Sequence, residues 1–382
     1  MFYYCMRQNS ESGSWFRIPW SVGITTGANM IYFRDDWDQW HVLVGMILAI
    51  GLLGCSLLSR QGADTEPTVV PTEPNKAVAQ LEKITLSLEL KSGTRTRYQV
   101  TTETVVTTEG PEAVVEDDAS TAIFQKVSEL SEVIFTQEIL GPTPEDTNSA
   151  IALITIDQVR YKRVSAGQPN LAFDSREPVD QNSPLAKLIG QAYTIEINPL
   201  GYVPGVFNLR PVRLAVRGPT PTHAAALDLV SPPSLFLRHG YFNLPGPDIG
   251  SLAIGDQWRG MQQYTLKIPG TNIGLGTHRF DKIYHLESVE QRPIGAVAVS
   301  VFMGSFKPRR TPDGRLVEDP FLSCSYSGGG EFNLDAGRVE SYLENLEVRM
   351  PLTRTESSPI KGSEGRFISL TRHCSVQRLD LD

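Results

Sequence analysis

The sequence predicts a mainly β protein, in which one or more curved antiparallel sheets form a half-barrel, a barrel or a sandwich, with few short helices. Runs rich in Val, Ile, Thr and Tyr recur over residues 81–382, and turn-forming residues separate them. The 32 glycines and 26 prolines are spread along the chain, as many turns between strands require. Hydrophobic residues make up 40% of the sequence, which is enough for a sizeable core.

The first expected strand covers residues 84–90, where Ile84, Leu86, Leu88 and Leu90 alternate with polar residues. A period of two places these four aliphatic side chains on one face of a strand. A turn at Ser92-Gly93 follows, and the run 94–108, rich in Thr, Val and Tyr, predicts a long strand with a polar face.

The stretch 141–148 contains a glycine and two prolines and predicts a loop between strands at 133–140 and 149–164. Further strands are expected at 192–198, 261–268, 276–290, 296–302, 331–334 and 367–379. Two segments, 121–140 and 337–350, also show helical spacing. We interpret both as strands because their neighbours are β.

One helix is expected around residues 222–229, with Thr222 as its N-cap and Pro232-Pro233 at its end. An aromatic segment follows at 236–242. Its residues Phe236, Arg238, Tyr241 and Phe242 form a candidate ligand-binding or partner-binding loop. The alternative is that this segment is a long connection that packs onto the sheet.

An apolar run at 42–54 ends in Leu52-Leu53-Gly54-Cys55. It is shorter than the ~20 residues that span a bilayer and has the length of a signal-peptide apolar region. This ending resembles the bacterial lipobox, which implies a lipid on Cys55. The preceding segment is acidic where a leader is normally basic, so either translation starts downstream of Met1 or residues 41–58 are an uncleaved membrane anchor.

The chain is expected to comprise a leader (1–55), an extended tether rich in Pro, Thr and Glu (56–80), and β-rich halves at 81–215 and 216–382. The two halves can equally form one domain, 81–382. The tether and either form of membrane attachment place residues 81–382 in the cell envelope, on the periplasmic or outer-membrane face. Cys324 and Cys374 then form a candidate disulfide, or else remain two buried thiols.

Several patterns that can indicate a site are weak here. His278 and His285 lie seven residues apart in one expected strand and therefore on opposite faces, which disfavours a shared metal. Residues 325–330, Ser-Tyr-Ser-Gly-Gly-Gly, lack a nucleophile or phosphate-loop pattern and predict a glycine-rich turn. Residues 307–310 are a short basic cluster, which we interpret as a solvated turn or as a contact with anionic lipid or cell-wall polymer.

Four blocks occur in an order that resembles an uncharacterised family of bacterial putative lipoproteins, classed as a domain of unknown function. They are a Tyr-bearing Thr-rich strand after Gly93, a Gly-x-x-Tyr-Thr block at 190–194, a Gly-Asp-x-Trp block at 255–258, and a glycine-rich stretch at 328–338. They cover residues 81–350. The resemblance implies an envelope location and a β-rich fold, and it implies no activity.

The sequence therefore predicts a lipid-anchored envelope protein with a non-catalytic binding or structural role. Its expected partners are the membrane, through the lipid on Cys55 or an apolar anchor, and an apolar ligand or another envelope component. The net charge of −8 and the lack of a basic stripe argue against nucleic acid, and no pattern points to a metal or cofactor. The alternative function is an envelope hydrolase whose site is assembled from scattered His, Asp and Ser residues.

Overall fold

Long antiparallel strands dominate the fold. The computed structural model describes residues 83–109, 126–144, 146, 148–165, 170–271, 273–308, 321–351 and 366–381. Its strands are β1 (Arg95–Glu109), β2 (Lys126–Pro142), β3 (Ala150–Ser165), β4 (Leu171–Asp174), β5 (Ala192–Ile197), β6 (Gly205–Phe207), β7 (Gln257–Lys267), β8 (Gly274–Arg292), β9 (Gly295–Phe306), β10 (Ser323–Asn333), β11 (Arg338–Pro351) and β12 (Phe367–Leu379).

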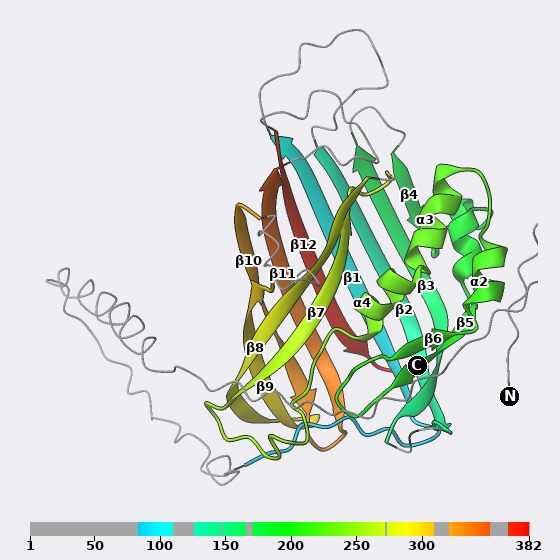
Figure 1. The fold of residues 1–382 in the computed structure, drawn as a ribbon. Helices are drawn as coiled ribbons and strands as arrows, with labels where there is room; N and C mark the ends of the chain where they lie inside the picture. Colours follow the sequence, from blue (N-terminus) through cyan, green and yellow to red (C-terminus); the bar gives the residue numbers. More distant parts are fainter. Residues whose placement is uncertain are drawn as a thin grey trace, which may run out of the picture. The chain divides into compact units, whose positions relative to one another are not determined.

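All twelve strands belong to one sheet in the order β6-β5-β3-β2-β1-β12-β11-β10-β9-β8-β7, and β4 pairs with β3 beside β5 (Figure 1). The strands of residues 81–215 occupy one end of this order and those of 216–382 the other. The two groups meet at the β1–β12 pair, so one continuous sheet runs through both of the expected halves. The predicted mainly β class is confirmed, as a curved open sheet.

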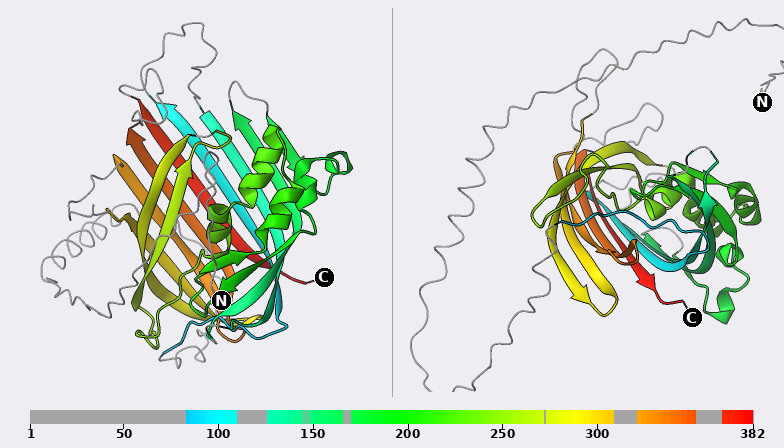
Figure 2. Two further views of the ribbon diagram at one scale, coloured as in Figure 1. Left: turned by 45° about the vertical axis from the view of Figure 1, so that its right-hand side comes forward. Right: turned by 90° about the horizontal axis from the view of Figure 1, so that it is seen from below.

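The sheet is strongly curved, as Figure 2 shows from two sides. Tyr264 on β7 donates a hydrogen bond of 2.5 Å to Glu344 on β11, although three strands separate β7 from β11 in the sheet. Four inter-strand steps in a flat sheet would place these strands about 19 Å apart. Irregular register in β2–β3 near Ile134 and in β8–β9 near Leu286 helps the strands to bend.

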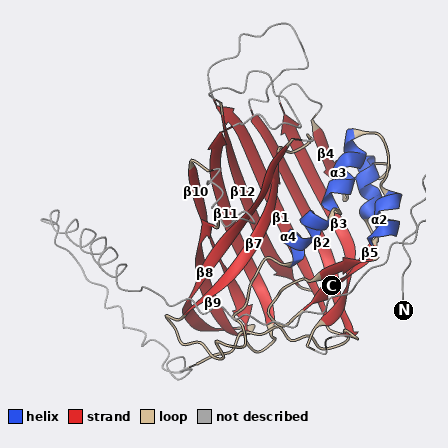
Figure 3. Cartoon of the chain, in the orientation of Figure 1, coloured by secondary structure: helices blue, strands red, loops and turns tan. Residues whose placement is uncertain are grey.

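Three α-helices within the described residues lie on the concave side of the sheet (Figure 3). They are α2 (Leu209–Ala215), α3 (Pro221–Leu229) and α4 (Pro232–His239), and two 3₁₀ turns, η3 (Pro178–Asp180) and η4 (Pro184–Leu188), precede β5. Thr220 caps α3 and Ser231 caps α4, each followed by a proline at the first helical position. No helix in the described part of the chain is both long and apolar enough to cross a bilayer.

Most strand predictions are confirmed, including the two ambiguous segments: β11 covers the second, and β2 covers the described part of the first. Residues 84–90 have the expected alternation of buried and exposed side chains, but they do not form a strand of the sheet. Ile84 makes an isolated bridge to Leu252, and Leu88 and Glu89 donate backbone hydrogen bonds to Pro199 and Gly337. This segment therefore runs along the core without a full strand partner.

Helix α3 ends at Leu229, before Pro232-Pro233, as the sequence predicts, but a second helix that was not predicted follows at once. These prolines open α4, because proline needs no hydrogen-bond acceptor in the first turn of a helix and has a helical φ. The expected helix at 222–229 is present as α3, and its cap is Thr220, two residues before the expected cap.

The expected leader, its Cys55, and the tether lie outside the described residues.

Candidate ligand-binding cavity

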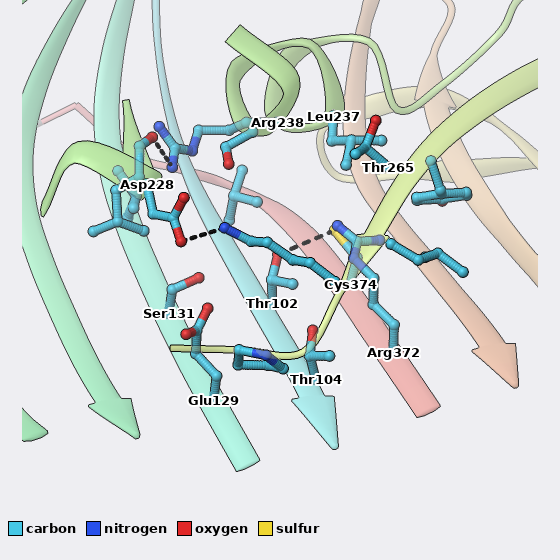
Figure 4. A pocket seen from close by; sticks show the side chains of 18 of the residues that line it. Thr102, Thr104, Glu129, Ser131, Asp228, Leu237, Arg238, Thr265, Arg372 and Cys374 are labelled. Carbon is cyan, nitrogen blue, oxygen red and sulfur yellow. Dashed lines mark hydrogen bonds and ion pairs between the residues drawn. The ribbon is translucent and has the colours of Figure 1, made fainter. Parts of the chain in front are cut away.

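A cavity of about 130 Å³ lies between the concave face of the sheet and the segment that covers it. Its floor comes from β1, β2, β3 and β12, and its roof from α3, α4 and the end of β7 (Figure 4). The lining mixes charged, hydroxyl and aliphatic side chains. Small-molecule sites typically combine apolar surface with a few polar groups that fix the ligand's orientation, and this lining contains both.

Two polar rows cross the floor of the cavity, and strand register creates both of them. Thr102 on β1 lies opposite Ser131 on β2 and Cys374 on β12. Two residues further along β1, Thr104 lies opposite Glu129 and Arg372. Since side chains alternate across a sheet, all six point to the concave side. Thr102 also donates a hydrogen bond to the Cys374 thiol, with an oxygen–sulfur distance of 3.8 Å.

An ion pair links two elements of the roof. Lys267 at the end of β7 forms an ion pair with the carboxylate of Asp228 in the last turn of α3. Both side chains are about 40% exposed, so this pair lies at the solvent side of the cavity. It joins the edge strand to the helical cover.

Arg238 is the most unusual residue of the roof because it is a buried cation without a carboxylate partner. Its side chain lies on α4, and the residue is only 7% exposed. Nη2 donates a 3.0 Å hydrogen bond to the carbonyl of Leu229, while Nη1 has no acceptor among the described residues. Burial and the Arg238 charge both lower the pKa of the neighbouring His239 well below its usual value, so His239 does not add a second charge.

Glu129 is the carboxyl group on the floor of the cavity. Tyr161 on β3 donates a 2.6 Å hydrogen bond to Oε2 of Glu129. Burial is the main cause that raises the pKa of Glu129, and the nearby Asp228 adds to it, whereas the Tyr161 hydrogen bond opposes the shift. Glu129 is thus a carboxyl group with a reduced tendency to carry charge.

A buried ion cluster adjoins the cavity at Arg372. Its centre is Glu344 on β11, which is 3% exposed, and its cations are Arg372 and the fully buried Lys282 of β8. The carboxylate accepts five hydrogen bonds: from Arg372 (2.7 Å) and Tyr264 (2.5 Å) at Oε1, and from Tyr342 (2.8 Å), Tyr326 (3.1 Å) and Lys282 (3.4 Å) at Oε2. Burial alone would raise the pKa of Glu344, but the two cations and the tyrosine hydroxyls hold it at about 2.

Aromatic rings enclose the ammonium group of Lys282. Its Nζ lies 4.9 Å from the ring centre of Phe302, 5.4 Å from that of Tyr326 and 5.3 Å from that of Tyr342. These are cation–π distances, and together with the hydrogen bond to Tyr342 they compensate part of the lost hydration. The ammonium group of Lys282 is therefore surrounded by hydrogen-bond and cation–π partners.

Glycines make room for these rings. A Cβ atom on Gly304 would lie 2.2 Å from the Tyr326 ring, and one on Gly328 would lie 2.6 Å from the Phe302 ring. The glycine-rich stretch 325–330 lies within β10. The predicted turn at this stretch is therefore wrong: the glycines lie within a strand, where they allow close approach of side chains.

The predicted aromatic segment at 236–242 divides between the core and the cavity. Phe236 and Arg238 lie on α4, and Tyr241 and Phe242 follow it. Tyr241 and Phe242 are buried in the core, and Phe236 is 38% exposed. Of these four residues, only Arg238 lines the cavity beneath α3 and α4.

The structure does not join the two described cysteines in a disulfide. Cys324 on β10 lies opposite Val348 of β11, and Cys374 on β12 lies opposite Glu344 of the same strand. The two cysteines are therefore two strands and four register positions apart, which exceeds the Cα separation that a disulfide spans. The structure supports the alternative of thiols, and the Cys374 thiol lines the cavity.

No group of three or more potential metal ligands converges within the described residues. His278 and His285 both lie on β8, where His278 faces Tyr264 of β7 and His285 faces Gln257. His373 on β12 bonds the side chain of Asn345 at 2.5 Å. In the basic cluster, Lys307 pairs with Asp281, and residues 309–310 lie outside the described chain.

The sequence interpretation missed Lys282, Glu344, Arg372 and Glu129. Each occupies an inward-facing position of a strand whose other inward positions are mostly apolar, as in Leu370-x-Arg372-x-Cys374. This alternation, with a charged residue at a position where apolar residues are expected, is visible in the sequence. It indicates that the charge is buried, although it does not show which buried charges contact one another.

Comparisons with known proteins leave the family open. No family model matches the chain, and no curated protein matches it. Among solved structures, one similar chain is DynF from the dynemicin biosynthesis pathway of Micromonospora chersina. It is 6% identical, and the match covers 81% of this chain and 92% of that one with a TM-score of 0.14. A TM-score of this size does not establish a shared fold.

Proposed function

We propose that this chain is a non-catalytic binding protein of the cell envelope, whose curved sheet holds a small ligand beneath helices α3 and α4. The observation that carries the proposal is the cavity itself. It has a defined floor and roof, and its volume of about 130 Å³ is on the order of a cavity that accommodates a benzene-sized molecule. Aliphatic and polar groups both line it, as a ligand with an apolar body and a polar group requires.

The envelope location is part of the same proposal and rests on the sequence. The apolar run 42–54 and Cys55 support attachment through a lipid, with an uncleaved anchor over 41–58 as the alternative. A binding domain at the end of an extended tether can reach ligands near the membrane surface. Mass spectrometry of the mature N-terminus from cells tests this part: a diacylated Cys55 supports it, and an unmodified chain free in the cytoplasm contradicts it.

The binding part is tested by filling the cavity. Thr102 lines the floor, and its neighbour Thr101 points to the convex face of the same strand. The full chain is purified from membranes in mild detergent, and the small molecules released on denaturation are identified by mass spectrometry. We expect a stoichiometric ligand with the natural sequence and with Thr101→Phe, and its loss with Thr102→Phe.

Recovery of no ligand from the natural chain, together with no stabilisation by a library of small carboxylates, amides and amines, contradicts the proposal. Equal ligand content in the two Phe variants contradicts the cavity as its location. Conversion of added ester or amide compounds to products would instead favour the envelope hydrolase.

A further inference from the structure

We infer that the cavity selects a small carboxylate ligand, and that Arg238 is the residue that binds it. This inference rests on the proposed binding function and specifies the chemistry of the ligand. It follows from three observations: the balance of charges around the cavity, the lack of a counter-charge at Arg238, and the size and lining of the space.

The charges that line the cavity do not cancel. Arg238, Arg372 and Lys267 contribute three cations, and Glu129 and Asp228 contribute two carboxyl groups. The adjoining Lys282 and Glu344 contribute one charge of each sign, so they leave this balance unchanged. The buried Arg163 of β3, whose charge also acts on Glu129, adds a further cation beside the cavity. The surroundings of the cavity are therefore net positive when every group is ionised, and a ligand carboxylate would reduce that surplus.

The two carboxyl groups are already engaged, so neither of them neutralises Arg238. Asp228 pairs with Lys267, and Glu129 accepts its hydrogen bond from Tyr161. Burial raises the pKa of Glu129, so this carboxyl group keeps its proton to a higher pH than an exposed Glu does. The cavity is therefore unsuited to a cationic ligand, and its positive charge is not fully compensated by the protein's own carboxyl groups.

Arg238 is the cation of the cavity lining that lacks a counter-charge. Its guanidinium is buried and lines the cavity, and no carboxylate pairs with it in the described part of the chain. Its polar neighbours are the Leu229 carbonyl and the Tyr193 hydroxyl, which are uncharged. A buried cation without a counter-charge is unfavourable, and a carboxylate would supply one with a charge-assisted hydrogen bond. The planar guanidinium fork also matches the geometry of a carboxylate.

The remaining lining defines the body of the ligand. Val100, Val133, Leu229, Leu237 and Leu370 supply aliphatic surface around a volume of about 130 Å³. That volume suits a single ring or a short aliphatic chain beside the charged group. We therefore expect a carboxylic acid of about the size of benzoate or hexanoate.

The test uses three probes with the same ring and different charge: benzoate, benzamide and benzylamine. Isothermal titration calorimetry measures their affinity for the full chain in detergent at neutral pH. We expect benzoate to bind at least tenfold more tightly than benzamide, and benzylamine to bind more weakly still. Arg238→Gln is expected to lower benzoate affinity at least tenfold and to leave benzamide affinity nearly unchanged.

The controls separate the charge of Arg238 from the integrity of the fold. Arg259→Gln removes an exposed arginine of β7 and is expected to leave all three affinities unchanged. Arg238→Lys keeps the charge without the fork and is expected to retain part of the benzoate preference. Urea unfolding curves identify any variant that does not fold. If Arg238→Gln does not fold, the benzoate affinity of Arg238→Lys is compared with that of the natural chain instead.

The outcomes distinguish this inference from the proposed function. Binding of benzamide or benzylamine as tight as that of benzoate overturns the carboxylate preference, while the cavity remains a binding site. Benzoate binding that survives both Arg238 variants overturns the role of Arg238. If no probe binds and the purified chain carries no ligand, the binding function itself fails.

Discussion

Glu344 shows how much a single buried charge depends on its neighbours. It is 3% exposed and lies between two cations and three tyrosine hydroxyls. A buried ion pair is not by itself a large source of stability, because the lost hydration offsets the attraction. Removing one member is costly, since the partners then remain buried without compensation.

Replacing Glu344 is therefore expected to destabilise the fold strongly. Glu344→Gln leaves Lys282 and Arg372 without a counter-charge, and such a loss typically costs about 3–5 kcal/mol. Urea unfolding measures the difference. Glu347→Gln is the matched control, because Glu347 is exposed on the same strand and its loss should change stability by less than about 0.5 kcal/mol. Similar free energies of unfolding for the two variants would contradict the stabilising role of Glu344 in the cluster.

Acid is expected to weaken the same cluster. The pKa of Glu344 is held at about 2 in the folded chain, below its ordinary value of 4.5. Its charge therefore contributes stability above pH 4.5 that is lost as the pH falls towards 2, by on the order of 3 kcal/mol. The natural chain should lose stability more steeply over this interval than Glu344→Gln, as measured by urea unfolding at successive pH values. Parallel curves would contradict the prediction.

The sequence indicates which charged residues are buried, but it does not show that they contact one another. The row Phe280, Lys282, Tyr284 on β8 and the row Tyr342, Glu344, Leu346 on β11 each place one charge among inward-facing apolar or aromatic residues. This parity identifies the buried charges from sequence alone. Their meeting depends on curvature, because β8 and β11 are not neighbours in the sheet.

At the scale of elements, β10 carries a run of glycines in the interior of a sheet. Glycine weakens an isolated strand, so the run would normally indicate a turn. Here it lets rings from neighbouring strands lie close to the backbone. Sequence reasoning missed this use because the rings come from β9 and from residues that follow α4.

A side chain at Gly328 is expected to disrupt this packing. A Cβ there would lie 2.1 Å from the carbonyl oxygen of Leu343, which is backbone and cannot rotate away. Gly328→Ala should destabilise the chain by about 1–3 kcal/mol, measured by urea unfolding. Gly274→Ala is the control, since no atom lies within 4 Å of the added Cβ. If the free energy of unfolding of Gly328→Ala equals that of the natural chain, the strand adapts to the added Cβ and the prediction is wrong.

Helix α4 illustrates a second limit of local sequence patterns. A double proline after a helical stretch indicates the end of a helix, and it equally suits the first turn of the next one. Ser231 resolves the ambiguity by capping α4. The consequence for the site is direct, because the helix places Arg238 over the floor of the cavity.

At the scale of the whole molecule, curvature brings distant parts of the sequence into one site. Periodicity predicted most of the strands and the mainly β class, because each long strand places its apolar side chains at alternate positions, on one face. It could not predict the strand order or the degree of curl, which depend on bulges and on the volume that the helices fill. The cavity exists only through that combination of sheet and cover.

The position of a bound probe tests this architecture most directly. Nuclear Overhauser effects between benzoate ring protons and selectively labelled methyl groups report which side chains lie within a few ångströms of the ligand. The cavity predicts effects to Leu229, Leu237 and Leu370, which line it. Effects confined to Met303 and Leu343, which are exposed on the convex face, or no effects at all with the chain saturated, would contradict a binding site inside the curved sheet.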